Sequence, residues 1–267
     1  MPSFNTVRAL QRGLEVLQVV NRHGGLRAQT VAQMTKLPRP TAYRLLETLE
    51  TLGFVALGPS DDGWRPTLKA KSLSSGFRDE AWVAQVAMPS IMALGRKVLW
   101  PVDLVTFSNY ALVVRESTHV HSPFSVDIGM VGRELPLLLT SGGRAYLAFS
   151  PEAERNAILD VLRASERPEH ALARKPATVA KILDRVRALG VGYRTEGFRA
   201  NTSSISSPIL HEGRVLACVT IVWIKTAMEL EEAIERYSEP LHGTCRRIAE
   251  SLSDCEPIVE PRAMQVS

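Results

Sequence analysis

The sequence RPTAYR at residues 39–44 places cationic, hydroxyl and aromatic side chains at the start of an expected helix. The guanidinium groups of Arg39 and Arg44 can bind phosphate oxygens or the edge of a guanine base. The hydroxyls of Thr41 and Tyr43 can donate hydrogen bonds to phosphate, and Tyr43 or Pro40 can contact a thymine methyl group. These residue types are those of a helix that inserts its first turns into the major groove of DNA.

The charge distribution favours the same chemistry. Residues 1–76 contain 10 Lys/Arg and 5 Asp/Glu, a net charge of +5, whereas the remaining residues contain 22 and 23, a net charge of −1. A basic module joined to a neutral domain is typical of polyanion binding. Arg65 and Lys69 are further candidates for phosphate contacts only. The alternative is a protein-interaction module in which Tyr43 anchors a partner.

The elements that must position these residues follow from hydrophobic periodicity. Helices are predicted over residues 6–22, where Val7, Leu10, Leu14 and Leu17 recur at helical spacing, and over residues 27–35. The third helix has Pro40 in its first turn and ends before Gly53. Two short strands, 54–57 and 64–68, flank an Asp62-Gly63 hairpin signal. Three helices followed by a hairpin is the order of a winged helix-turn-helix.

These segments resemble the N-terminal domain of the IclR family of bacterial transcription regulators. The resemblance rests on VRALQRGLEVLQVV, on LPRPTAYRLLETLETLGFV and on the wing. It implies a C-terminal domain that senses a small molecule. Residues 68–98 are predicted to be mostly helical, and in the family a linker helix here helps to pair two DNA-binding domains. The domain boundary is placed near residue 76.

The rest of the chain mixes strands and helices, so the predicted fold class is α+β with one main sheet. The effector-binding domain is expected over 77–256, and residues 257–267 are expected to be a disordered tail. Strands are predicted at 102–107, 111–117, 121–128, 203–210 and 214–223, and helices at 140–149, 151–163, 176–189 and 229–252.

The family resemblance continues through GMVGRELPLLLTSGGRAYLAF, GVGYRTEGF and SSISSPIL, and so covers residues 6–252. It implies a GAF-like sensor, in which an antiparallel sheet carries a ligand cavity. The sequence departs from the family at Arg144, where lysine is usual, and at Gly197-Phe198. Within the family, the chain most resembles activators of 3-(3-hydroxyphenyl)propionate and related aromatic acid catabolism. The alternative is a repressor that responds to a keto acid such as pyruvate or glyoxylate.

The candidate effector site begins at Ser141-Gly142-Gly143. Backbone amides at a helix start can bind a carboxylate without any side chain, and the resemblance implies that this segment contacts the effector acid. The resemblance also places Met130, Ser204 and Thr220 at the cavity. For Ser141 the alternative is a plain helix cap, and for Met130 and Thr220 it is burial in the core.

Arg133 is the best single cation for a carboxylate, because its planar fork binds one bidentately. The alternative is a surface arginine that pairs with Glu134 or Asp127. Three aromatic side chains, Trp100, Phe107 and Phe124, could supply a wall for an aromatic ring.

Other functions find little support. No Gly-x-Ser-x-Gly elbow, phosphate-binding loop or dinucleotide fingerprint occurs, so we predict neither an enzyme nor a cofactor. His119 and His121 could bind a metal with Glu116 or Asp127 if they alternate to one face of a strand, but two histidines are a weak signal and no metal site is predicted. The three cysteines form no CxxC pair.

The expected partners are therefore double-stranded DNA, an aromatic acid and further copies of the chain. A dimer or tetramer is expected because a palindromic operator mirrors a two-fold protein. The ligand could act on the paired DNA-binding domains or on contacts with RNA polymerase. No membrane span or secretory signal is found, so we expect a cytoplasmic protein.

Overall fold

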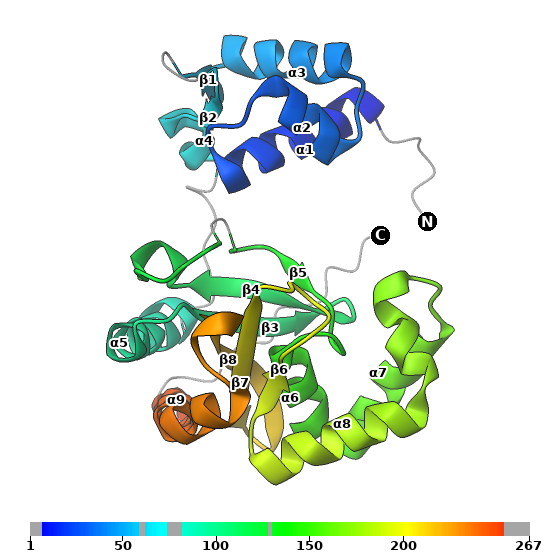
Figure 1. The fold of residues 1–267 in the computed structure, drawn as a ribbon, viewed down its shortest axis with the longest axis vertical. Helices are drawn as coiled ribbons and strands as arrows, with labels where there is room; N and C mark the ends of the chain where they lie inside the picture. Colours follow the sequence, from blue (N-terminus) through cyan, green and yellow to red (C-terminus); the bar gives the residue numbers. More distant parts are fainter. Residues whose placement is uncertain (1–6, 59–61, 74–81, 128–129, 254–267) are drawn as a thin grey trace. The chain divides into compact units, whose positions relative to one another are not determined.

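The computed structural model describes residues 7–58, 62–73, 82–127 and 130–253. The chain divides into two compact units, Met1–Arg78 and Asp79–Ser267, and each is described by itself (Figure 1). The predicted boundary near residue 76 and the predicted tail at 257–267 lie outside the described residues.

The first unit is a winged helix-turn-helix, which confirms the predicted order of elements. Its helices and strands pack around a core that includes Val20, Leu46 and Trp64. Gly53 follows the third helix with a φ of 77°, a backbone conformation that suits glycine. The elements are α1 (Arg8–His23), α2 (Ala28–Thr35), α3 (Arg39–Thr51), β1 (Val55–Leu57), β2 (Trp64–Pro66) and α4 (Leu68–Ser72).

The apolar repeat in α1 does not mark its buried face. Of the four repeating residues, only Leu17 is buried. Val7, Leu10 and Leu14 are 68%, 62% and 50% exposed, because α1 packs on α2 and α3 mainly through its second half. The first half of α1 therefore presents an apolar strip, formed by these three side chains.

The second unit contains a six-stranded sheet in the order β5-β4-β3-β8-β7-β6, in which all neighbouring strands are antiparallel. The two longest strands, β7 and β8, form a hairpin in which Glu212 and Gly213 have positive φ. The strands are β3 (Val102–Ser108), β4 (Ala111–Ser117), β5 (Glu134–Leu135), β6 (Gly192–Arg194), β7 (Thr202–His211) and β8 (Arg214–Ile224).

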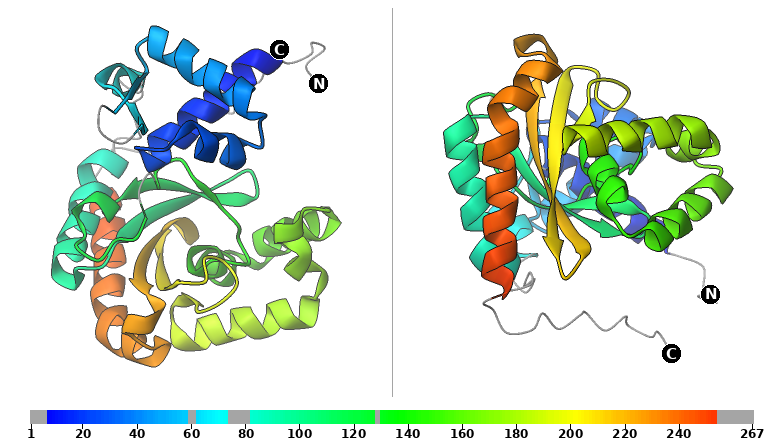
Figure 2. Two further views of the ribbon diagram at one scale, coloured as in Figure 1. Left: turned by 45° about the horizontal axis from the view of Figure 1, so that its top comes forward. Right: turned by 90° about the horizontal axis from the view of Figure 1, so that it is seen from below.

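Helices cover both faces of the sheet (Figure 2). On one face, α9 (Leu230–Ser253) contacts β7 and β8, and α5 (Met88–Val98) contacts β3. On the other face, α6 (Ser141–Phe149) contacts β6, β7 and β8, with α7 (Glu152–Ala164) and α8 (Pro176–Leu189) beyond it. This arrangement confirms the α+β class with an antiparallel sheet. No helix in the described part of the chain is long and apolar enough to cross a membrane.

The strand predicted over 121–128 is wrong. His119–His121 form a 3₁₀ turn, and the described residues after it, up to 127, form no strand. Pro123 cannot donate to a ladder, and β4 is instead paired by the unpredicted strand β5 through Leu112 and Leu135. Two apolar side chains of this segment, Phe124 and Val126, are exposed.

The helical segment predicted over 68–98 is divided into shorter helical elements. It comprises α4, a π-helical turn at Val83–Ala87 and α5, while residues 74–81 lie outside the described residues.

Candidate functional site

Helix α3 separates its residues into a core face and an outer face. Ala42, Leu46 and Leu49 are buried in the helical core, whereas Tyr43 and Arg44 are exposed on the outer face. Arg39 and Pro40 are also exposed, and Thr41 is half-buried. The helix begins directly after the turn that follows α2, with Pro40 in its first turn, so its amino-terminal end remains accessible. The outer face therefore has the charge and shape that a groove-binding helix needs.

The two predicted phosphate contacts near the wing also have roles within the domain. Lys69 Nζ donates to the carbonyl oxygen of Leu52 at 2.9 Å and lies 5.0 Å from the ring centre of Phe54. A cation at this place satisfies the carboxyl end of α3. Arg65 is exposed, and its Nη1 donates to the carbonyl of Gly63 at 3.2 Å. Their contact with DNA remains a prediction.

A cavity lies between the sheet and the amino-terminal end of α6. Its volume is about 40 Å³, and the empty space that also includes open solvent is about 470 Å³. It is lined by Asp103, Val105, His119, Asp127, Met130, Leu135, Thr140, Ser141, Gly142, Arg194, Phe198, Arg199, Thr202, Ser204, Thr220 and Val222.

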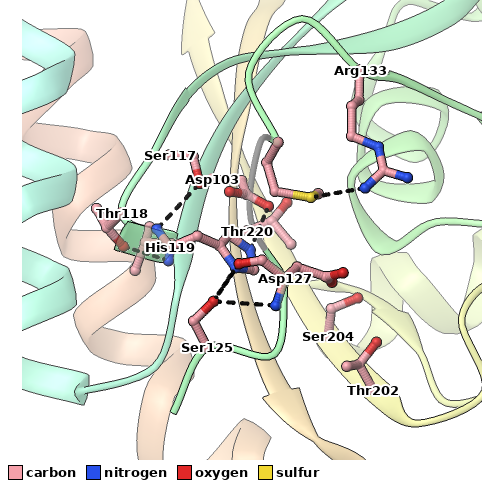
Figure 3. A network of polar contacts seen from close by, with 12 residues as sticks. Asp103, Ser117, Thr118, His119, Ser125, Asp127, Arg133, Thr202, Ser204 and Thr220 are labelled. Atoms are coloured by element: carbon pink, nitrogen blue, oxygen red, sulfur yellow. Dashed lines mark hydrogen bonds and ion pairs between the residues drawn. The ribbon is translucent and has the colours of Figure 1, made fainter. Parts of the chain in front are cut away.

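Three hydroxyl residues of the sheet line the cavity, namely Thr202, Ser204 and Thr220 (Figure 3). Ser204 accepts a hydrogen bond from Ser141 at 2.8 Å, which links β7 to the start of α6. Thr220 donates to Ser206 at 2.9 Å, and Ser206 donates to the carbonyl of Val219 at 3.0 Å. The strands bring these residues together because Thr220 pairs with both Ser206 and Asp103 in the sheet.

The start of α6 is held close to the sheet. Thr140 caps the helix by accepting from the amide of Gly143 at 3.3 Å. A side chain at Gly143 would overlap the carbonyl group of Leu137, and one at Gly142 would meet Leu112 and Val105 at 3.0 and 3.1 Å. The amides of Ser141 and Gly142 lie in the first turn, which has no acceptors within the helix. They can therefore donate to an anion in the cavity.

The structure brings together five of the seven predicted effector residues: Met130, Ser141, Gly142, Ser204 and Thr220 all line the cavity. Gly143 does not line it, and its amide donates to the capping hydroxyl of Thr140. Arg133 does not line it either; its Nη1 lies 3.5 Å from the sulfur of Met130.

The predicted aromatic wall is not part of the cavity lining. Trp100 packs against Phe124 with ring centres 4.9 Å apart, and Phe107 stacks on Tyr146 at 4.9 Å. Phe198 is the aromatic residue among the lining side chains.

Two arginines that were not predicted as site residues, Arg194 and Arg199, line the cavity. Arg194 is buried and donates to the carbonyls of Phe198 and Thr202 at 2.6 and 2.5 Å, so it ties down the segment between β6 and β7. Burial, and then repulsion from Arg144, lower the pKa of Arg194 to about 10, which leaves it charged at neutral pH.

Arg199 is the second of these arginines and forms an ion pair with Asp127 at the cavity. Burial lowers the pKa of Arg199, and the negative charge of Asp103 opposes that shift. Both arginines lie in the segment GYRTEGFRA. Two arginines so close together were the feature of the sequence that could have indicated an anion-binding site.

Asp103 and His119 were also missed. Asp103 is 3% exposed and His119 is 4% exposed, and Nε2 of His119 lies 3.6 Å from Oδ2 of Asp103. An acidic residue within the apolar strand VDLVTF was the available signal. His121 is exposed, so the two histidines do not share a face as the strand interpretation required. Within the described ranges, no three His, Cys, Asp or Glu side chains are grouped as a metal site.

Comparison with known families agrees with this architecture. A family model described as the IclR helix-turn-helix domain matches residues 9–58, and one described as the bacterial transcriptional regulator IclR C-terminal matches residues 78–250. The chain belongs to the IclR family. An IclR-family member of this kind is a DNA-binding transcriptional regulator rather than an enzyme.

Individual relatives are distant. The HTH-type transcriptional regulator KdgR of Escherichia coli is 22% identical over 92% of each chain. The transcriptional repressor IclR of E. coli is 22% identical, covering 80% of this chain and 78% of its own. A crystal structure of an IclR homologue from Microbacterium hydrocarbonoxydans, complexed with 4-hydroxybenzoate, matches with a TM-score of 0.60 and 20% identity, covering 92% of this chain and 100% of its own. At this identity, the structural match shows the fold alone.

Proposed function

We propose that this IclR-family regulator is an activator that binds a small aromatic carboxylic acid in the cavity beside α6 and controls genes of aromatic acid catabolism. The observation that carries the ligand class is the set of polar groups at the start of α6. Ser141, Gly142 and Ser204 all line the cavity. The amides of Ser141 and Gly142 lie in the first turn of α6, and Ser204, which accepts from Ser141, keeps its own hydroxyl proton for another acceptor. Such a set of donors suits a carboxylate.

The volume of the cavity supports a proposal for how such a ligand would lie. An engineered cavity of about 150 Å³ holds benzene, whereas this cavity measures about 40 Å³, a volume that suits a carboxylate but not a whole ring. The ring would lie toward the mouth, beside Met130 and Phe198. The homologue bound to 4-hydroxybenzoate supports an aromatic acid as the ligand class.

A second candidate follows from the same volume. A two- or three-carbon keto acid such as glyoxylate or pyruvate is much smaller than an aromatic acid and needs less room beyond this volume of about 40 Å³. In this alternative the protein is a repressor, as the E. coli relative IclR is described.

DNA binding requires two copies of the winged helix if the operator is palindromic, and we propose a dimer or tetramer. The exposed strip of Val7, Leu10 and Leu14 on α1 supports an interface with a second copy, because such apolar strips are commonly covered in assemblies. Ligand binding would then change the relation between paired DNA-binding domains or their contacts with RNA polymerase.

The test is the thermal stability of the full chain in the presence of 3-(3-hydroxyphenyl)propionate, 4-hydroxybenzoate, pyruvate and glyoxylate. A ligand at 100 times its dissociation constant adds about 2.7 kcal/mol to the free energy of unfolding. We expect an aromatic acid to raise the melting temperature, and Ser204→Ala to reduce that shift.

The matched control is Ser203→Ala, because Ser203 is a neighbouring buried hydroxyl that does not line the cavity. A shift with pyruvate or glyoxylate only would select the second candidate. If no acid shifted the melting temperature, the proposal of a carboxylate ligand would be wrong. The proposal of DNA binding does not depend on this result.

A further inference from the structure

Asp103 carries an unsatisfied acceptor inside the cavity. It lies on β3, opposite Thr220 of β8. Its side chain lines the cavity, and the residue is only 3% exposed. Its Oδ1 accepts no hydrogen bond from any described protein group. A buried carboxylate oxygen without a donor is costly, so its position facing a cavity is informative about what enters that cavity.

The hydrogen bonds around His119 define how its ring faces Asp103. Ser125 Oγ donates its single proton to the carbonyl of Asp127 at 2.7 Å, so it must accept from Nδ1 of His119, also at 2.7 Å. A neutral His119 therefore carries its proton on Nδ1. Its Nε2 then presents a lone pair toward Asp103, and no described group donates to this atom.

The two facing atoms cannot satisfy each other. Nε2 of His119 and Oδ2 of Asp103 are 3.6 Å apart, beyond hydrogen-bonding distance, and both are acceptors when His119 is neutral. A hydroxyl group supplies what this pair lacks, because it can donate a hydrogen bond to Asp103 and can accept one from Nε2 of His119 if the imidazole is charged. An ammonium group suits the place less well, because Arg199 already brings a positive charge near Asp103.

The sheet separates this pair from the carboxylate end of the cavity. Asp103 is on β3 and Ser204 is on β7, with β8 between them. Neighbouring strands are about 4.8 Å apart, so backbone positions two strands apart are separated by roughly 10 Å. A ligand that reaches both ends carries its hydroxyl several atoms away from its carboxylate.

We propose that Asp103 and His119 form a specificity site that binds a hydroxyl group of the effector at the end remote from its carboxylate. The inference rests on the proposed function, because it assumes that the cavity binds an acid through Ser141, Gly142 and Ser204. It adds the class of that acid: a hydroxy acid with a remote hydroxyl, such as a hydroxylated aromatic acid.

The first test needs no substitution. Calorimetric titration of the full chain compares 4-hydroxybenzoate with benzoate, with 4-fluorobenzoate, which fills similar space but donates no proton, and with 2-hydroxybenzoate, whose hydroxyl adjoins the carboxylate. We expect 4-hydroxybenzoate to bind about ten-fold or more tightly than the other three, because a hydrogen bond to a charged group gives a difference of this order.

The second test compares Asp103→Ala with Val105→Ala, a neighbouring cavity residue on the same strand that loses only apolar atoms. Asp103→Ala should bind 4-hydroxybenzoate and benzoate equally, whereas Val105→Ala should keep the preference. Preservation of the preference in Asp103→Ala would overturn the proposal. If that variant does not fold, the titration of the unsubstituted chain decides.

The two proposals fail in different ways. Equal binding of 4-hydroxybenzoate, benzoate and 4-fluorobenzoate would overturn the hydroxyl site and leave the acid-binding cavity standing; a bridging water molecule would then account for Asp103 and His119. Failure of all four acids to bind a chain that still binds DNA would overturn both the hydroxyl site and the proposed aromatic ligand.

Discussion

Arg199 pairs with Asp127, 72 positions earlier in the chain, where both side chains line the cavity. The side chains are 21% and 24% exposed, so the pair is partly shielded from water. It joins the segment between β6 and β7 to the segment that follows the 3₁₀ turn. An acid that enters the cavity therefore meets this ion pair in addition to Arg194 and Asp103.

Substitution of either member should change acid affinity in opposite directions. Arg199→Ala removes a positive charge and should weaken binding of an anionic ligand by about five-fold, whereas Asp127→Asn removes a negative charge and should strengthen it by a similar factor, each about 1 kcal/mol. Calorimetric titration with the bound acid measures both. Arg236→Ala, which breaks the exposed Arg236–Glu232 pair on α9, is the control. A change of the same sign in both cavity variants would argue against an electrostatic role.

Arg44→Ala should weaken DNA binding without changing acid binding. The side chain is exposed on the outer face of α3, and a lost phosphate contact should reduce the slope of log affinity against log salt by about 1. Fluorescence anisotropy with operator DNA at several salt concentrations measures this slope. Arg163→Ala removes an equal charge from α7 in the other unit and should leave DNA binding unchanged. Loss of acid binding in Arg44→Ala would contradict the assignment of the two activities to separate units.

Leu10→Asp should weaken self-association. Leu10 is 62% exposed between Val7 and Leu14, and a charge buried at an interface between two copies is strongly unfavourable. Light scattering should show a lower mass, and affinity for a palindromic site should fall. Ala9→Asp adds the same charge at an exposed position away from the strip and should associate normally. If Leu10→Asp had the same mass as the unsubstituted protein, the proposal that α1 lies in the interface would be wrong.

Arg194→Lys should loosen the segment between β6 and β7. Arg194 donates from Nη1 to the carbonyls of Phe198, Arg199 and Thr202, and from Nη2 to Thr202 Oγ1 at 2.9 Å. An ammonium group cannot reproduce this planar set of donors, so we expect a loss of about 2 kcal/mol in the free energy of unfolding. Urea denaturation measures the loss. Arg185→Lys, an exposed substitution on α8, should change stability little; equal stability of the two variants would exclude the bracing role.

The thiols of Cys218 and Cys245 should react slowly in the folded protein. Burial raises the pKa of Cys218 well above its usual range and that of Cys245 to about 12. Thiolate is the reactive form, so alkylation of these two residues by iodoacetamide at pH 8 should require unfolding. Mass spectrometry of peptides from folded and urea-treated protein tests this expectation, and rapid labelling of either cysteine in the folded protein would contradict it.

The same shifts determine how stability depends on pH. The unfolded thiols lose protons above a pKa of about 8.5, whereas the folded thiols keep them. The unfolded state therefore binds fewer protons at high pH, and the stabilising contribution, complete below pH 8, should decline as pH rises toward 12. Urea denaturation of the unsubstituted chain and of Cys245→Ala between pH 8 and pH 10 checks the sign: the substituted protein should lose less stability over this interval.

Sequence periodicity and local residue preferences predicted most of the fold. Helix α3, helix α6 and strands β7 and β8 depend on residues within a few positions of one another, which is why they could be predicted. The 121–128 strand failed because the alternating pattern did not show that β5 would pair with β4.

The exposed face of α3, which we propose to contact DNA, was determined by the sequence itself, since the basic charge and the exposed side of one helix are local properties. The cavity was decided by tertiary structure. Sequence reasoning chose Arg133 as the cation, but the fold brings Arg199 to the cavity, and it places Asp103 beside His119. Such contacts depend on sheet register and on the path of connecting segments, and these are set by packing across the whole domain rather than by the neighbours of each residue in the chain.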